Sequence, residues 1–145
     1  MRYFEDFAEG QEFDLGTTVA DEADMIEFAR RFDPQPFHVD PEAARRSPFG
    51  ELVASGWYTG SLFMRLYFDA VLHDTASRGS PGCEELSWPA PVRPGDTLHG
   101  RLRVDSVRPS AKRSDRGSAM IEGVLERDGV TVLRIRFRAL LSRRP

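Results

Sequence analysis

An aspartate and a histidine, Asp33 and His38, lie five residues apart in Asp33–Pro41, a segment with three prolines. A carboxylate and an imidazole that share one water molecule can activate that water and transfer its protons. Proline fixes backbone torsions, which lowers the entropy lost when nearby side chains are held in place. The segment therefore predicts an acid–base pair in a short irregular loop. Because the same spacing also occurs in ordinary turns, the pair needs a structural context.

The context is a long apolar stretch, Ala54–His73, which is free of proline and too long for a strand, so we predict a helix. Apolar residues cover nearly its whole circumference, which is typical of a helix buried on most sides. We attribute Gly60, in mid-helix, to close packing of a strand. Charged residues inside the stretch argue against a membrane span. The only polar stripe consists of Ser61, Arg65, Asp69 and His73.

Shorter elements precede this helix. A strand is predicted at Glu12–Val19, and a helix follows from its N-cap, Asp21, to Phe32. Asp40 is predicted to cap a short helix over Pro41–Arg46. The Asp33–His38 loop therefore lies between two helices, shortly before the central helix.

Strand-like segments with alternating apolar residues follow the central helix. Asp128-Gly129 marks a hairpin, and pairing Glu122 with Arg136 places opposite charges together; this register also pairs Glu126 with Val132 and requires a three-residue loop or a bulge. An antiparallel sheet can curl its apolar face around one helix, so we expect a single α+β domain over residues 1–145. The predicted strands are Cys83–Trp88, Asp96–Val107, Ser118–Arg127 and Val130–Leu141.

Composition narrows the class of protein. The net charge of -3 gives no support to nucleic acid or an anionic membrane as the main partner. Cys83 is the single cysteine, which excludes an intramolecular disulfide and a thiolate metal site. The first residues carry acids where a signal peptide needs an apolar run, so a cytoplasmic location is expected.

Two segments, Phe32–His38 and Gly50–Trp57, together resemble the MaoC-like dehydratases, relatives of the (R)-specific enoyl-CoA hydratases. The family pattern is Gly-Asp-x-Asn-Pro-x-His. Asp33, Pro36 and His38 match it, whereas Phe32 replaces the glycine and Gln35 the asparagine. The Pro91–Asp96 segment before a predicted strand is also family-like.

The resemblance implies a hot-dog fold, an antiparallel sheet wrapped around a long central helix, and a lyase that hydrates 2-enoyl thioesters or runs the reverse dehydration. It implies Asp33 as base and His38 as the residue that orients water and shuttles a proton. Gly56, at the predicted helix start, would offer its backbone N–H to an enolate-like oxygen. Gln35 and Ser61 are further candidates for substrate binding. No metal or other cofactor is expected beyond the thioester of CoA or acyl carrier protein.

Two alternatives stay open, a hot-dog acyl-CoA thioesterase and a non-catalytic acyl-binding subunit. A thioesterase of this fold usually carries a carboxylate near the start of the central helix, where Trp57–Phe68 has none. A non-catalytic acyl-binding subunit would not need both Asp33 and His38. Because open sheet edges are a liability, and the family commonly pairs them, we expect a homodimer or higher homo-oligomer with sheets paired edge to edge. Acyl-chain length, branching and reaction direction are left open.

Overall fold

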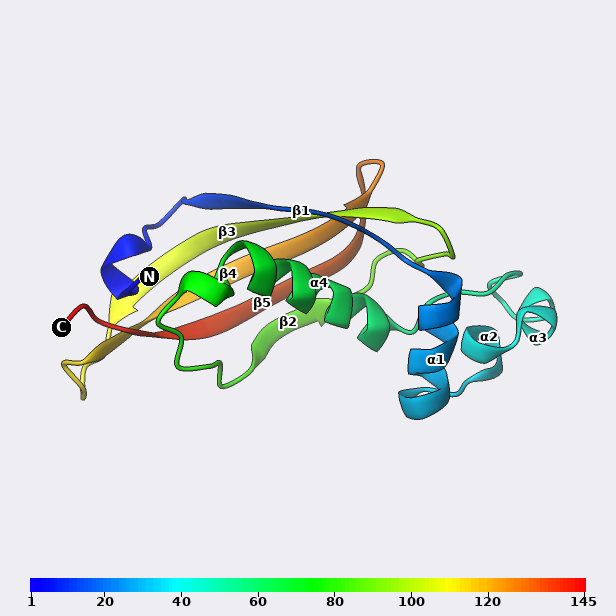
Figure 1. The fold of residues 1–145 in the computed structure, drawn as a ribbon, viewed down its shortest axis with the longest axis horizontal. Coiled ribbons are helices and arrows are strands. Elements are labelled where there is room, and N and C mark those ends of the chain that lie inside the picture. The colour runs from blue at the N-terminus through cyan, green and yellow to red at the C-terminus, as the bar shows by residue number, and fades with distance from the viewer.

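A computed structural model describes residues 1–145 as one five-stranded antiparallel sheet with a long helix lying across one face (Figure 1). The strands lie in the order β1-β3-β4-β5-β2. This is the predicted α+β hot-dog arrangement, and each predicted strand is present. The strands are β1 (Glu12–Val19), β2 (Cys83–Ser87), β3 (Thr97–Pro109), β4 (Arg116–Arg127) and β5 (Val130–Ser142).

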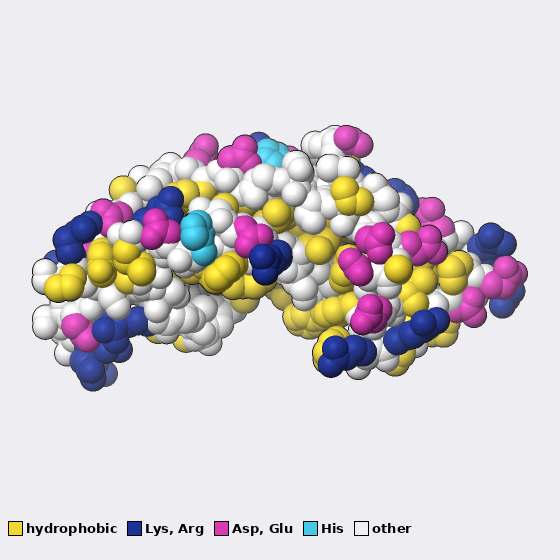
Figure 2. Space-filling model, viewed as in Figure 1, with side chains coloured by type: hydrophobic (Ala, Val, Ile, Leu, Met, Phe, Trp, Pro, Cys, Tyr) yellow, Lys and Arg dark blue, Asp and Glu magenta, His cyan; other side chains and the backbone are white.

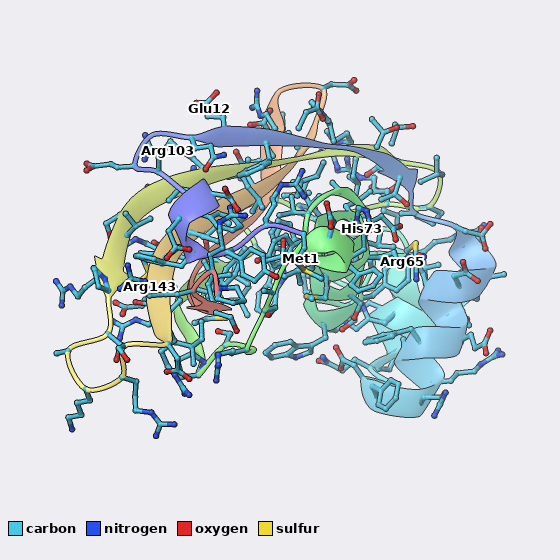
Figure 3. The ribbon with its side chains drawn as sticks, turned by 60° about the vertical axis from the view of Figure 1, so that its left-hand side comes forward. Met1, Glu12, Arg65, His73, Arg103 and Arg143 are labelled. Atoms are coloured by element: carbon cyan, nitrogen blue, oxygen red, sulfur yellow. The ribbon has the colours of Figure 1, made fainter.

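The alternation along the strands separates a core face from an outer face. In β3, Leu98, Leu102 and Val104 are buried beneath the helix. Charged side chains occupy the outer face, where Glu12 on β1 lies opposite Arg103 on β3 (Figure 3). The period of two thus explains both faces of the sheet.

The central helix is α4 (Gly56–Ala70), followed by the 3-10 turn η2 (Leu72–Asp74). It is shorter than predicted at both ends, since Ser55 caps its start and Val71 leaves helical torsions with φ of -132°. Phe63 and Tyr67 are buried and join the core. No helix in the structure is both long enough and apolar enough to cross a membrane.

Burial of α4 on most sides was predicted and is wrong for the single chain. Trp57, Met64 and Phe68 are 59%, 48% and 46% exposed. Their spacing of seven and four residues places them on one side of the helix, because one sheet covers only the opposite side. The packing explanation for Gly60 is also wrong, since a Cβ there would meet nothing within 4 Å.

The hairpin between β4 and β5 has the predicted register, with Glu122 opposite Arg136. The predicted irregularity is a bulge between Leu125 and Glu126, so Glu126 pairs with Thr131 and not with Val132. Asp128 and Gly129 both have positive φ, 48° and 80°, as tight two-residue hairpin turns require.

The short helices gather at one end of the molecule, at the right in Figure 1, beside the start of α4. The Asp21 side chain accepts a hydrogen bond from Asp24 N–H, and Asp40 accepts one from Glu42 N–H, so both predicted caps are confirmed. The loop predicted after Asp33 is not wholly irregular, because Pro36 starts one helical turn. The elements at this end are α1 (Glu22–Phe32), α2 (Pro36–Val39) and α3 (Pro41–Arg45), whereas the 3-10 turn η1 (Phe4–Asp6) lies at the opposite end, near the N-terminus.

Candidate active site

The helical turn α2 brings His38 back against Asp33. The distance between His38 Nε2 and Asp33 Oδ2 is 3.3 Å. The ring is buried, and Nδ1 donates a hydrogen bond to the Val53 carbonyl oxygen at 2.7 Å. Because a carbonyl only accepts, Nδ1 carries a proton, so that in the neutral form of the ring the lone pair is at Nε2. Two acceptors then face each other, an arrangement that suits a water molecule that donates to both.

The carboxylate of Asp33 is held by two further side chains. Gln35 Nε2 donates to Oδ1 at 2.8 Å, and Ser55 Oγ donates to Oδ2 at 2.7 Å. Burial raises the pKa of the Asp33 carboxyl, but these two hydrogen bonds and the nearby His38 hold that pKa below its ordinary value. Asp33 is therefore ionised at neutral pH and able to accept a proton.

Asp33 and His38 open into a cavity of about 470 Å³. On the face shown in Figure 2, hydrophobic side chains line a hollow between the sheet and the end that carries α1–α3. A few converging polar groups in an apolar wall are typical of a small-molecule site. The cavity is also lined by Gly56, Gln35, Phe37, Phe49, Trp57, Trp88 and Val132.

Gly56 is the first residue of α4, and its N–H donates no hydrogen bond within the protein. The Trp88 indole packs directly against it: a Cβ at Gly56 would lie 2.5 Å from Trp88 Cε2. Trp88 in turn meets Trp57 edge to face, with ring centroids 5.2 Å apart. Gly56 thus combines a free N–H in the cavity wall with a close aromatic contact that no other residue allows.

The structure brings together Asp33, His38, Gln35 and Gly56, but not Ser61. The Ser61 hydroxyl is exposed, donates to the Trp57 carbonyl oxygen at 2.8 Å and does not line the cavity. Conversely, Ser55 belongs to the site although it was not among the predicted site residues. Its place immediately before the helix signalled the cap, but nothing in the sequence signalled its contact with Asp33, 22 residues earlier.

Comparison with known proteins identifies the family of this chain. The family model of the MaoC-like domain matches residues 6–124 of this chain. This range includes all of the polar groups of the candidate site. The chain belongs to the MaoC-like domain family. The predicted resemblance to MaoC-like dehydratases is therefore confirmed.

Individual members are similar over most of the chain. The crystal structure of a MaoC-like dehydratase from Rhodospirillum rubrum is 40% identical with a TM-score of 0.93, covering 100% of this chain and 99% of that one. An (R)-specific enoyl-CoA hydratase from Rhodospirillum rubrum is 33% identical over 117 residues, 77% of this chain and 76% of that protein. A 3-hydroxybutyryl-CoA dehydratase from Methylorubrum extorquens is 33% identical over 77% of this chain and 69% of its own length.

Proposed function

We propose that this protein is a lyase that adds water to a 2-enoyl thioester or removes water from the 3-hydroxyacyl thioester. The observation that carries the proposal is the pair of facing acceptors, Asp33 Oδ2 and His38 Nε2, 3.3 Å apart in a cavity that Gly56 also lines. Two relatives named as an enoyl-CoA hydratase and a 3-hydroxybutyryl-CoA dehydratase support the same chemistry.

In this proposal one water donates to both Asp33 and His38. Its oxygen forms a bond to C3 as Asp33 takes one of its protons, and the C2–C3 double bond opens toward the thioester oxygen. The free Gly56 N–H stabilises the negative charge that develops on that oxygen. His38 orients the water, takes that proton from Asp33 at Nε2 and delivers it to C2, so both residues return to their starting forms and one water is added in total. Gln35 holds Asp33 from its other oxygen.

The acyl chain extends along α4 in this proposal. A second cavity of about 220 Å³ lies one to three turns beyond Gly56, between α4 and β5. Its wall is mostly apolar and includes Gly60, Phe63, Tyr67 and Phe137. The missing side chain of Gly60 widens this cavity, which suits an apolar acyl group better than a charged one. The carrier is CoA or acyl carrier protein.

We also propose that two copies of this chain associate. β1 and β2 are the edges of the sheet, and each leaves backbone groups unpaired on its outer side. The face of α4 that carries Trp57, Met64 and Phe68 is an apolar surface that a second copy would cover. Light scattering at micromolar concentration should give the mass of a dimer or a higher homo-oligomer; a stable monomer would contradict the association.

Hydrolysis is the weaker alternative, because α4 offers no carboxylate to the cavity. Its single acid, Asp69, is exposed and pairs with Arg65 at 2.9 Å. The deciding experiment offers 2-enoyl-CoAs of graded chain length and follows loss of the conjugated thioester absorbance, beside thiol release from saturated acyl-CoAs. We expect hydration that falls roughly 10²–10⁴-fold in Asp33→Asn. A rate of thiol release above the rate of hydration would indicate a thioesterase. Binding of the acyl-CoA without turnover would indicate a non-catalytic acyl-binding subunit.

A further inference from the structure

Ser55 connects the start of α4 to the Asp33 carboxylate. It is 0% exposed, and its hydroxyl donates to Asp33 Oδ2 at 2.7 Å while accepting from Trp57 N–H at 3.3 Å. A hydroxyl has one proton to donate. Because the Trp57 N–H occupies a lone pair of the oxygen, that proton can only point toward the Asp33 carboxylate. Ser55 therefore acts as acceptor for the helix and donor for the acid, both at once.

We propose that Ser55 is a positioning residue, which fixes the Asp33 carboxylate relative to His38 and to the Gly56 N–H. This inference rests on the proposed hydration chemistry for its catalytic consequence. Gly56 follows Ser55 directly in the chain, so one hydrogen bond from the buried Ser55 sets the distance between the base and the N–H that would receive the thioester oxygen.

The surroundings of Asp33 explain why such a residue is needed. Asp33 lies just beyond α1, with φ of -154° and ψ of 68°, so regular structure does not hold its side chain. Its other hydrogen-bond donor, Gln35, is exposed and competes with solvent. The hydrogen bond from the fully buried Ser55 is better shielded from water and is the more persistent of the two. Ser55 is therefore the main support of the carboxylate orientation.

The hydrogen bond also has a measurable electrostatic effect. Although burial raises the pKa of the Asp33 carboxyl, the bonds from Gln35 and Ser55, together with His38 in its protonated form, keep that pKa lower than normal. A bond to the ionised form favours ionisation, so its removal raises that pKa. Since the base must be ionised, the acid limb of the activity profile then moves to higher pH.

Two substitutions separate positioning from capping. Glycine is nearly as good an N-cap as serine, whereas alanine is a poor one, and neither has a hydroxyl. Ser55→Gly and Ser55→Ala should therefore differ in melting temperature. Both should nevertheless lose kcat/KM for enoyl-CoA hydration by on the order of 10–10²-fold, mostly in kcat, since a displaced base costs activity even when binding persists. Both acid limbs should move to higher pH.

Asp21→Ala provides the matched control, because it removes the side-chain cap of α1 and leaves Asp33 untouched. It should lower the melting temperature and leave the acid limb in place. If activity instead follows stability, so that Ser55→Gly is active and only Ser55→Ala is impaired, Ser55 is a cap alone and the inference is overturned.

An NMR titration of the Asp33 carboxyl keeps this test separate from the proposed function. The pKa should be higher in Ser55→Gly than in the wild type, whether or not the protein hydrates enoyl-CoA. An unchanged pKa overturns the inference even if the wild type is an active hydratase. A wild type without hydration activity, with the expected pKa change in Ser55→Gly, overturns the proposed function and leaves the link between Ser55 and Asp33 established.

Discussion

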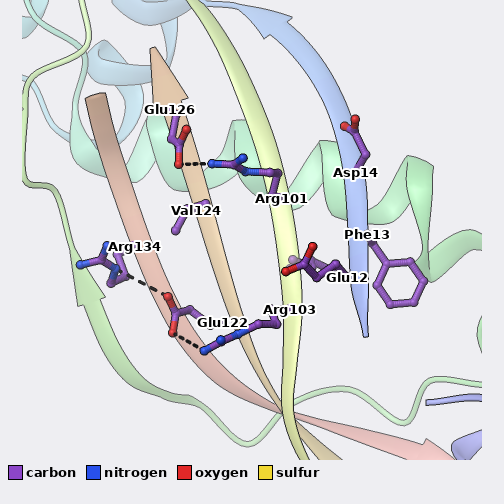
Figure 4. Close-up of a pocket in the computed structure, with 10 residues that line it drawn as sticks. Glu12, Phe13, Asp14, Arg101, Arg103, Glu122, Val124, Glu126 and Arg134 are labelled. Carbon is purple, nitrogen blue, oxygen red and sulfur yellow. Dashed lines mark hydrogen bonds and ion pairs between the residues drawn. The ribbon is translucent and has the colours of Figure 1, made fainter. Parts of the chain in front are cut away.

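Two regions of this protein pair acids with bases in hollows of similar size. The outer face of the sheet holds a ladder of charged pairs, Arg101 with Glu126, and Arg103 and Arg134 with Glu122 (Figure 4). The hollow there measures about 410 Å³, against about 470 Å³ for the cavity at Asp33. Volume and pairing alone therefore do not distinguish a candidate active site from a solvated surface.

The difference lies in what surrounds each pair. Glu122 is 3.9 Å from Arg103 and 3.8 Å from Arg134, and all three side chains are at least 32% exposed. Such exposed pairs contribute about 0–1 kcal/mol, because water screens them and long side chains lose entropy. In the cavity, His38 is buried and its tautomer is set by Val53. The Asp33–His38 pair, held in one orientation in an apolar wall, is the arrangement that acid–base catalysis needs.

The largest expected effect comes from breaking the Asp33–His38 pair. Asp33→Asn and His38→Ala should each lower enoyl-CoA hydration roughly 10²–10⁴-fold. The double variant should be little worse than the poorer single one, because residues that act as a unit are not additive. Steady-state kinetics on all three variants, with substrate affinity measured separately, checks this. Full additivity would mean that the two residues do not share one water.

Gly56→Ala tests the other half of the cavity. A Cβ at this position would meet the Trp88 indole, so both packing and access to the N–H are disturbed. We expect hydration to fall on the order of 10²-fold, as for a lost oxyanion donor. The variant Gly56→Ala combined with Trp88→Ala removes the indole and is compared with Trp88→Ala alone. If the added methyl then costs no activity, Gly56 serves packing only.

Much of the fold could be predicted from local patterns. The period of two located β3, β4 and β5, and the opposite charges of Glu122 and Arg136 predicted the register of β4 against β5. Asp21 and Asp40 located two helix starts, because a cap depends on residues within one turn. These features require only neighbours in sequence or one hairpin partner.

Contacts between distant segments could not be predicted in this way. Ser55 meets Asp33 across 22 residues, and Trp88 meets Gly56 across 32, and neither contact leaves a periodic signal. The nearly all-apolar circumference of α4 was interpreted as burial on most sides, but the sheet covers one side only. For the candidate site, the family pattern supplied Asp33 and His38, whereas the positions of Ser55 and Ser61 required the three-dimensional structure.

Gly123→Ala sharpens the contrast between the two faces of the sheet. Gly123 faces the core on β4, where a Cβ would lie 2.3 Å from Cζ of the buried Phe63 on α4. Because Phe63 is enclosed, we expect a loss of about 1–3 kcal/mol of unfolding free energy from overpacking. Urea unfolding measures it. A variant as stable as the wild type would show that α4 shifts freely against the sheet.

The smallest effect is expected one residue away, on the opposite face. Glu122→Gln keeps the size of the side chain and removes the charge that Arg103 and Arg134 share. Its neighbours are exposed and long, so the two arginines separate into water and the unfolding free energy should change by no more than about 0.5 kcal/mol. That change should disappear at about 1 M salt, where charges are screened within roughly 3 Å.

Hydration of enoyl-CoA should be unaltered, because the charged pairs of Glu122 lie on the face of the sheet turned away from α4. Urea midpoints at low and high salt measure the change in unfolding free energy and its dependence on salt, and a hydration assay measures the activity. A tenfold loss of activity with normal stability would show that the charged hollow takes part in function after all, and that exposure does not separate the two regions.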